Sequence, residues 1–76
     1  MDPQAVKFLA AGLAMGLGAL GPGIGIGILG YGAMQGLARN PEARGPIMTN
    51  MLIAIGMAEA IGIYALIVAI ILAMVA

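Results

Sequence analysis

Two long runs without charged residues dominate this chain and restrict how it can fold. The first run, residues 8–38, separates Lys7 from Arg39 and contains no Asp, Glu, Lys or Arg. The second run is the 32 residues after Arg44, in which the single charged residue is Glu59. A helix needs about 20 predominantly apolar residues to cross a bilayer. Both runs exceed this length, so the sequence predicts an all-α membrane protein folded as a two-helix transmembrane hairpin.

The overall composition excludes several classes of function. Of the 76 residues, 63% are hydrophobic and 8% are charged, whereas about a quarter of a typical soluble domain is charged. The chain has no Cys and no His, which excludes thiol and histidine catalysis and the usual metal clusters. Three basic residues cannot neutralise a row of phosphates, so we expect no nucleic-acid partner. A chain this short needs lipid, or further copies of itself, to be stable.

The segment between the two runs, RNPEARGP at residues 39–46, is predicted to be a polar loop. It holds two prolines, a glycine and three charges, and proline disfavours helix at the residue before it. We therefore predict helix over about residues 6–38 and again over about 47–75, so that residues 1–76 form one hairpin. The positive-inside rule places the loop in the cytoplasm and both termini outside. A signal peptide is the alternative for the first run, but its apolar region covers only about 7 to 15 residues.

The first predicted helix is unusually rich in glycine. It carries ten glycines, although each costs about 1 kcal/mol relative to alanine inside a helix. At about 100° per residue, they divide into two sectors on nearly opposite faces. One sector contains Gly12, Gly16, Gly23, Gly27 and Gly30, and the other contains Gly18, Gly21, Gly25, Gly32 and Gly36. Spacings of four between small residues let helices approach closely in lipid. Two such faces predict a close neighbour on each side, and identical neighbours can close into a ring.

The second predicted helix has one small-residue face instead of two. This face consists of Ala54, Ala58, Gly62, Ala65, Ala69, Ala73 and Ala76. We expect it to pack against protein while the bulky remainder of the helix faces lipid, so that the first helix lies inside the ring and the second outside. Pro22 lies inside the first helix, where it removes a backbone hydrogen bond and favours a kink. General glycine enrichment of membrane helices is the alternative to a ring.

Glu59 is the one ionisable residue well inside either apolar run. The predicted second helix begins about 18 Å away from it and the chain ends about 25 Å away, at 1.5 Å per residue. A charged group at such depth costs roughly 2.5 to 3.5 kcal/mol or more and is functional by default. Desolvation favours the neutral acid, so we expect Glu59 to carry a proton and to ionise only opposite a cation from another protein. A structural glutamate, hydrogen-bonded within an oligomer, is the alternative.

Three motifs together resemble one known family. They are GPGIGIG at residues 21–27, ARNPEAR at residues 38–44 and AEAIGIY at residues 58–64. Their order, spacing and total length resemble those of the c subunits of F-type ATP synthases, the proteolipids of the membrane rotor. The resemblance implies a non-catalytic component of a multi-pass membrane complex, in the plasma membrane of a bacterium.

The same resemblance implies partners and roles. Copies form a ring, and the carboxyl matching Glu59 exchanges protons with the a subunit of the ATP synthase stator, near an arginine of that partner. The polar loop, here Arg39, Asn40 and Pro41, contacts the γ and ε subunits of the central stalk. The commonest bacterial tripeptide is Arg-Gln-Pro, so Asn40 departs from it. Gly21, Gly23, Gly25 and Gly27 are expected at the contacts between helices.

The resemblance also implies the transported ion. Sodium-binding members have a glutamine at the position of Ile26 and a Ser or Thr pair after the glutamate, where this chain has Ala60 and Ile61. A hard cation would therefore lose oxygen ligands, and we expect a proton rather than sodium, with no cofactor. Tyr64 matches a tyrosine near the ion. The expected neighbours of the proton on Glu59 are Tyr64, Ile26, Met57 and Ala60.

Other interpretations explain fewer of these features. GIGILG at residues 25–30 matches a dinucleotide-binding pattern, but that motif requires a preceding strand. A small pore-forming protein would need a polar face along its helix. A purely structural assembly factor would leave Glu59 without a purpose.

Overall fold

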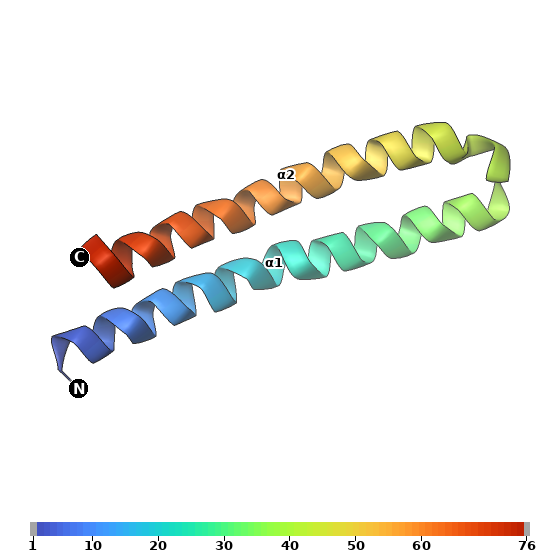
Figure 1. Cartoon of the computed structure of the whole chain (residues 1–76). Coiled ribbons are helices and arrows are strands. Elements are labelled where there is room, and N and C mark those ends of the chain that lie inside the picture. Colours follow the sequence, from blue (N-terminus) through green and yellow to red (C-terminus); the bar gives the residue numbers. More distant parts are fainter. Residues whose placement is uncertain (1, 76) are drawn as a thin grey trace.

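The computed structural model describes residues 2–75, which form an antiparallel pair of long helices. Helix α1 covers Pro3–Arg39, a short 3-10 turn η1 covers Pro41–Ala43, and helix α2 covers Arg44–Ile70 and continues as a π-helical turn, η2, over Ile71–Val75. Figure 1 shows α1 and α2 side by side, joined at one end, with both termini at the other end. The Cα atoms extend over 58 × 17 × 8 Å, so the molecule is one helix thick. The predicted two-helix hairpin is confirmed.

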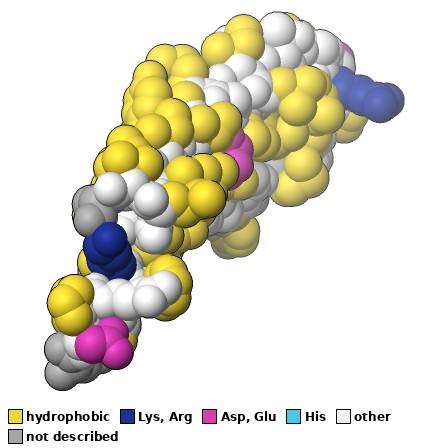
Figure 2. Space-filling view, turned by 60° about the vertical axis from the view of Figure 1, so that its left-hand side comes forward, with side chains coloured by type: hydrophobic (Ala, Val, Ile, Leu, Met, Phe, Trp, Pro, Cys, Tyr) yellow, Lys and Arg dark blue, Asp and Glu magenta, His cyan; other side chains and the backbone are white. Residues whose placement is uncertain are grey.

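Both halves of the described chain are long and apolar enough to cross a membrane. Within residues 2–75 the two spans are Pro3–Arg39 and Pro41–Val75, whose most apolar stretches of 18 residues have mean hydropathies of 1.7 and 2.5. Almost none of either span is buried in the hairpin. Figure 2 shows apolar side chains over most of one face, with charged groups at the two ends and one acidic group near mid-length. Such a surface needs lipid or other protein around it.

The start of α1 is fixed by a cap and lies three residues before the predicted start. The Oδ1 atom of Asp2 accepts a hydrogen bond of 2.7 Å from the backbone N–H of Ala5. Pro3 occupies the first helical position, where a missing N–H costs nothing because that group has no partner in the helix. Further along, α1 continues through Pro22.

The connector is shorter than the predicted loop of residues 39–46. Arg44 already begins α2, so Gly45 and Pro46 lie in its first turn rather than in the loop. Proline is tolerated there because the first N–H groups of a helix have no partner within it. The tip is closed by the N–H of Ala43, which donates to the carbonyl of Asn40 at 2.9 Å.

The small-residue face of α2 packs against α1. Ala54, Ala58, Gly62, Ala65 and Ala73 are half-buried, and Ala69 is the one buried residue within 2–75. Ala76 of the same predicted face lies outside the described residues. A Cβ atom built at Gly18 would overlap the Cβ of Ala65, and one built at Gly36 would lie 3.2 Å from the Cδ1 atom of Ile47. These two contacts share one antiparallel register, and among the glycines of α1 it is Gly18 that lies closest to α2.

Candidate functional site

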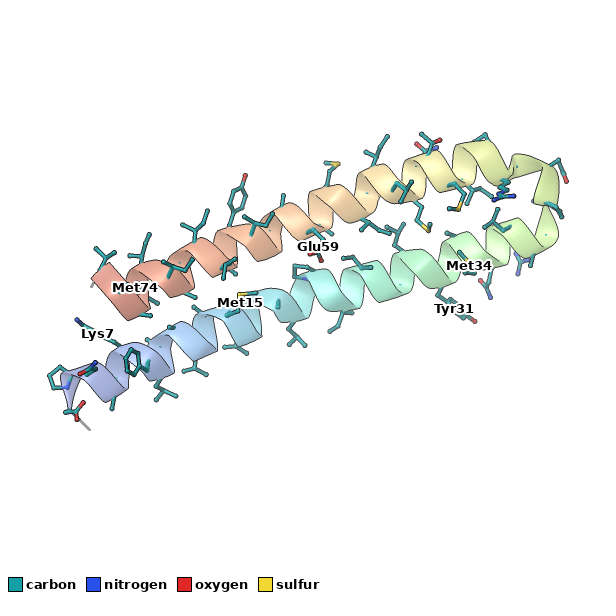
Figure 3. All side chains as sticks on the ribbon, in the orientation of Figure 1. Lys7, Met15, Tyr31, Met34, Glu59 and Met74 are labelled. Atoms are coloured by element: carbon teal, nitrogen blue, oxygen red, sulfur yellow. The ribbon has the colours of Figure 1, made fainter. Side chains whose placement is uncertain are left out.

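Glu59 lies near the middle of α2, at the edge of the face that packs on α1, and its side chain is exposed in the single hairpin. Figure 3 shows its carboxyl group in the space between the two ribbons. Within the span of α2 and η2, about 22 Å of helix separates it from Arg44 and about 24 Å separates it from Val75, at 1.5 Å per residue. The register set by Gly18 and Gly36 places it opposite about residue 24 of α1. The carboxyl therefore lies at mid-depth of any membrane that the hairpin spans.

A cavity of about 230 Å³ adjoins this carboxyl. It is lined by Met15, Ala19, Pro22 and Gly23 from α1 and by Glu59, Gly62, Ile63 and Leu66 from α2. The α1 residues follow Met15 by four, seven and eight, and the α2 residues follow Glu59 by three, four and seven. These are the spacings of residues that share one helix face. Glu59 supplies the only polar side chain among the lining residues.

None of the four residues predicted to surround the proton lines this cavity. Tyr64 is 66% exposed and Met57 is 69% exposed. They follow and precede Glu59 by five and two residues, which places them about 140° and 160° away around α2. Ile26 and Ala60 are half-buried, but neither lines the cavity. Their place beside the proton stays a prediction.

The α1 side of the cavity contains residues that the sequence pattern does not assign to the site. Met15, Ala19 and Pro22 line it, and the sequence singles out only Pro22 among them, as a kink. Proline has no N–H, so the carbonyl of Gly18, four residues earlier, receives no hydrogen bond from residue 22. The helical spacing of these residues is visible in the sequence, but the pairing of α1 with α2 is not.

Most glycines of α1 have open space beside them. Nothing lies within 4 Å of a Cβ atom built at Gly12, Gly16, Gly21, Gly23, Gly25, Gly27, Gly30 or Gly32. Their missing side chains are therefore not needed for contact with α2. The four glycines predicted at helix contacts, Gly21, Gly23, Gly25 and Gly27, all belong to this open set, and Gly23 also lines the cavity beside Glu59.

The hairpin tip presents polar side chains at the end opposite the termini. Arg39, Asn40 and Pro41 are all exposed. The backbone of Asn40 is engaged within the tip, because its N–H donates to the carbonyl of Gly36 at 2.9 Å and its own carbonyl accepts from Ala43. The backbone is thus held in place while the side chains remain available to a partner. Within residues 2–75, no group of three or more His, Cys, Asp or Glu residues could hold a metal ion.

Comparison with known proteins gives consistent matches along the chain. The family described as the C subunit of ATP synthase matches residues 9–72. The ATP synthase c subunit of Dehalococcoides mccartyi is 59% identical over 76 residues, covering all of both chains. The ATP synthase c subunit of a Synechococcus species is 50% identical over 74 residues, covering 95% of this chain and 91% of the relative. That of Thermotoga maritima is 56% identical over 63 residues, covering 83% of this chain and 74% of the relative.

Proposed function

Because the chain belongs to the family of ATP synthase c subunits and is a non-catalytic component of the rotor of an F-type ATP synthase, we propose that Glu59 is the group that carries the transported proton. The observation that supports this role is its position: it faces an apolar cavity at the middle of a membrane-length helix. Asp2, Lys7, Arg39, Glu42 and Arg44 all lie near the ends of the helices or in the tip. No other charged residue of this chain can exchange a proton at that depth.

The proposed cycle needs two states of one carboxyl. While Glu59 faces lipid or another copy, it is protonated and neutral, because an ionised carboxylate is strongly disfavoured in hydrocarbon. When it reaches the a subunit of the stator, the O–H bond gives its proton to an aqueous half-channel, and the carboxylate is stabilised by a cation of the stator. A proton from the other half-channel then restores the neutral acid. This chain has no Lys or Arg at the depth of Glu59, so the cation comes from the partner.

The open glycines support assembly into a ring of identical chains. They leave room for a helix backbone to approach α1 closely, which is how membrane helices without bulky contacts associate. With α1 inside and α2 outside, each copy contacts one neighbour on each side. Tyr64 and Met57 are exposed in the single hairpin, and we propose that they complete the proton site at the contact between chains.

The lining of the cavity supports a proton rather than a sodium ion. Apart from Glu59, its walls are side chains of Ala, Gly, Ile, Leu, Met and Pro, none of which contains oxygen. Hard cations in proteins are bound by several oxygen ligands, whereas a proton needs only the carboxyl itself. The loop in turn is proposed to face the cytoplasm of a bacterium, where Arg39, Asn40 and Pro41 contact the γ and ε subunits of the central stalk.

Replacement of the carboxyl tests the proposed role directly. Glu59→Gln keeps the shape and hydrogen-bonding capacity of the side chain but cannot ionise, so rings should assemble while proton-driven ATP synthesis stops. Glu59→Asp is the matched control, because it ionises but withdraws the carboxyl by one methylene, and it should retain reduced synthesis. Synthesis is measured in vesicles carrying the whole complex under an imposed proton gradient. Appreciable synthesis by a ring with Gln at every position would falsify the proposal.

Chemical labelling tests the choice of ion. Carbodiimides react with protonated carboxyl groups in apolar surroundings, so Glu59 should be labelled in the detergent-extracted ring, and added sodium should not slow the reaction. The rate is followed by mass spectrometry at constant pH and ionic strength, with potassium as the control salt. Strong protection by sodium but not by potassium would overturn the proton assignment.

A further inference from the structure

A polar pocket lies at the open end of the hairpin, far from Glu59. Its volume is about 590 Å³, and it is lined by Asp2, Pro3, Gln4 and Lys7 from the start of α1 and by Ala73 and Met74 from η2. Lys7 is half-buried, and Figure 3 shows its side chain extending from α1 toward the end of the second helix. The proton-carrying role uses none of these residues.

The pocket holds one positive and one negative side chain. Asp2 and Lys7 are five residues apart, about 7.5 Å along the axis of α1, and Figure 2 shows an acidic and a basic group set apart on the same face at one end of the molecule. Asp2 is held in place by its hydrogen bond of 2.7 Å from Ala5. A phosphate alone would be attracted by Lys7 and repelled by Asp2. A ligand with separate negative and positive groups would satisfy both.

The depth of the pocket matches that of lipid headgroups. Lys7 and Arg39 are 32 residues apart on one continuous helix, which is about 48 Å of rise. A bilayer measures about 30 Å across its hydrocarbon core and about 40–45 Å with its headgroups. At the usual tilt of about 20° the helix spans about 45 Å of that thickness, so when Arg39 lies at the outer edge of one headgroup layer, Lys7 lies at the outer edge of the other. Toward the membrane centre the exposed surface becomes apolar, with Phe8 56%, Leu9 49% and Ile70 47% exposed.

We propose that this pocket binds the headgroup of a phospholipid that carries both a phosphate and a primary ammonium group, of the phosphatidylethanolamine type. The phosphate oxygens accept hydrogen bonds from the ammonium group of Lys7, and the lipid ammonium donates to the carboxylate of Asp2. The acyl chains lie along the apolar surface that begins at Phe8. The site does not depend on proton transfer, and each chain provides one.

Native mass spectrometry of the full-length chain, in its detergent-extracted assembly, tests the proposal. After removal of native lipid, phosphatidylethanolamine, phosphatidylglycerol and phosphatidylcholine with the same acyl chains are added separately. Phosphatidylethanolamine should bind at up to one lipid per chain and about tenfold more tightly than the other two, the effect of one charge-assisted hydrogen bond. Phosphatidylglycerol lacks the ammonium group, and phosphatidylcholine has no N–H to donate. Equal retention of all three lipids would overturn the proposal.

Substitutions of Lys7 and Asp2 test separately the proposed contacts with the phosphate and with the ammonium group of the lipid. Lys7→Gln should weaken binding of phosphatidylethanolamine about tenfold, and Lys7→Arg should restore it. Asp2→Asn still caps α1, since Asn and Asp are equally good caps, but it should abolish the preference over phosphatidylglycerol. Unchanged lipid selectivity in Asp2→Asn would overturn the proposal even if Lys7→Gln failed to assemble. Arg44→Gln, at the other end, and Glu59→Gln should bind lipid as the unmodified chain does, which separates this site from the proton-carrying function.

Discussion

Gly18 and Gly25 lie about two turns apart on α1, yet they have different surroundings. A Cβ atom at Gly18 would overlap that of Ala65 on α2, whereas nothing lies within 4 Å of one at Gly25. Gly18 is therefore needed for the hairpin to close. Gly25 carries the same cost of about 1 kcal/mol in helix propensity with no compensating contact inside the chain. This difference supports the proposal that the other glycines of α1 serve contacts between copies.

The largest effect is expected for a bulky residue at an open glycine. Gly25→Leu should leave the hairpin intact, because the hairpin offers space there, but it should hold neighbouring copies apart and abolish or enlarge the ring. Ring size and yield are read from a gel after mild detergent extraction, and helix content is read from circular dichroism. Gly23→Leu should act in the same way, although Gly23 also adjoins the Glu59 cavity. Normal rings from both variants would show that the open glycines are not interfaces.

An intermediate effect is expected at Gly18, the glycine that has no room for a side chain beside α2. Gly18→Ala forces its new methyl group against Ala65, and overpacking of this kind costs about 1–3 kcal/mol. The hairpin should lose helix at a lower SDS concentration, followed by circular dichroism. Ala65→Gly in the same chain should restore part of the loss, with Ala65→Gly alone as the control. If the two substitutions were simply additive, the predicted contact would be absent.

The smallest effect is expected at Gly36. A Cβ atom there lies 3.2 Å from Cδ1 of Ile47, the flexible end of a side chain that can move aside. The gain in helix propensity, about 1 kcal/mol, should offset this contact, so Gly36→Ala should leave the same SDS transition nearly unchanged. In a chain that already carries Ile47→Val, which removes Cδ1, Gly36→Ala should stabilise the hairpin relative to Ile47→Val alone. If Gly36→Ala lowered the SDS transition as much as Gly18→Ala does, the side chain of Ile47 would be held as rigidly as that of Ala65.

The hairpin itself is predictable because the lengths of the apolar runs leave few alternatives. The ends of the helices are harder to predict from the sequence. Asp2 followed by Pro3 is a recognisable helix start, but the apolar pattern alone predicts that the helix begins at about residue 6. The predicted start of α2 is too late because Gly45 and Pro46 resemble loop residues, whereas the first turn of a helix accepts proline.

The candidate site is predictable only in part, for a physical reason. Depth in an apolar run identifies Glu59, and helical spacing alone would add Gly62, Ile63 and Leu66. The α1 wall depends on the register between the helices, which the contact of Gly18 with Ala65 sets. Tyr64 and Met57 do not line the cavity, and their proposed role depends on a contact between chains. Their assignment stays a prediction.

The flatness of the hairpin affects how many copies fit into the proposed ring. Because the Cα atoms extend over only 8 Å in the thinnest direction of the hairpin, each copy in the proposed ring occupies a narrow sector, and neighbouring inner helices are separated by about 8–10 Å or less where glycines meet. In the proposed mechanism, each copy adds one Glu59 and therefore one proton to every revolution. The width of an inner helix, which glycine keeps small, then fixes how many protons fit into a given circumference. A substitution that widened α1 would therefore change the number of protons carried per revolution, while the chemistry at Glu59 stayed the same.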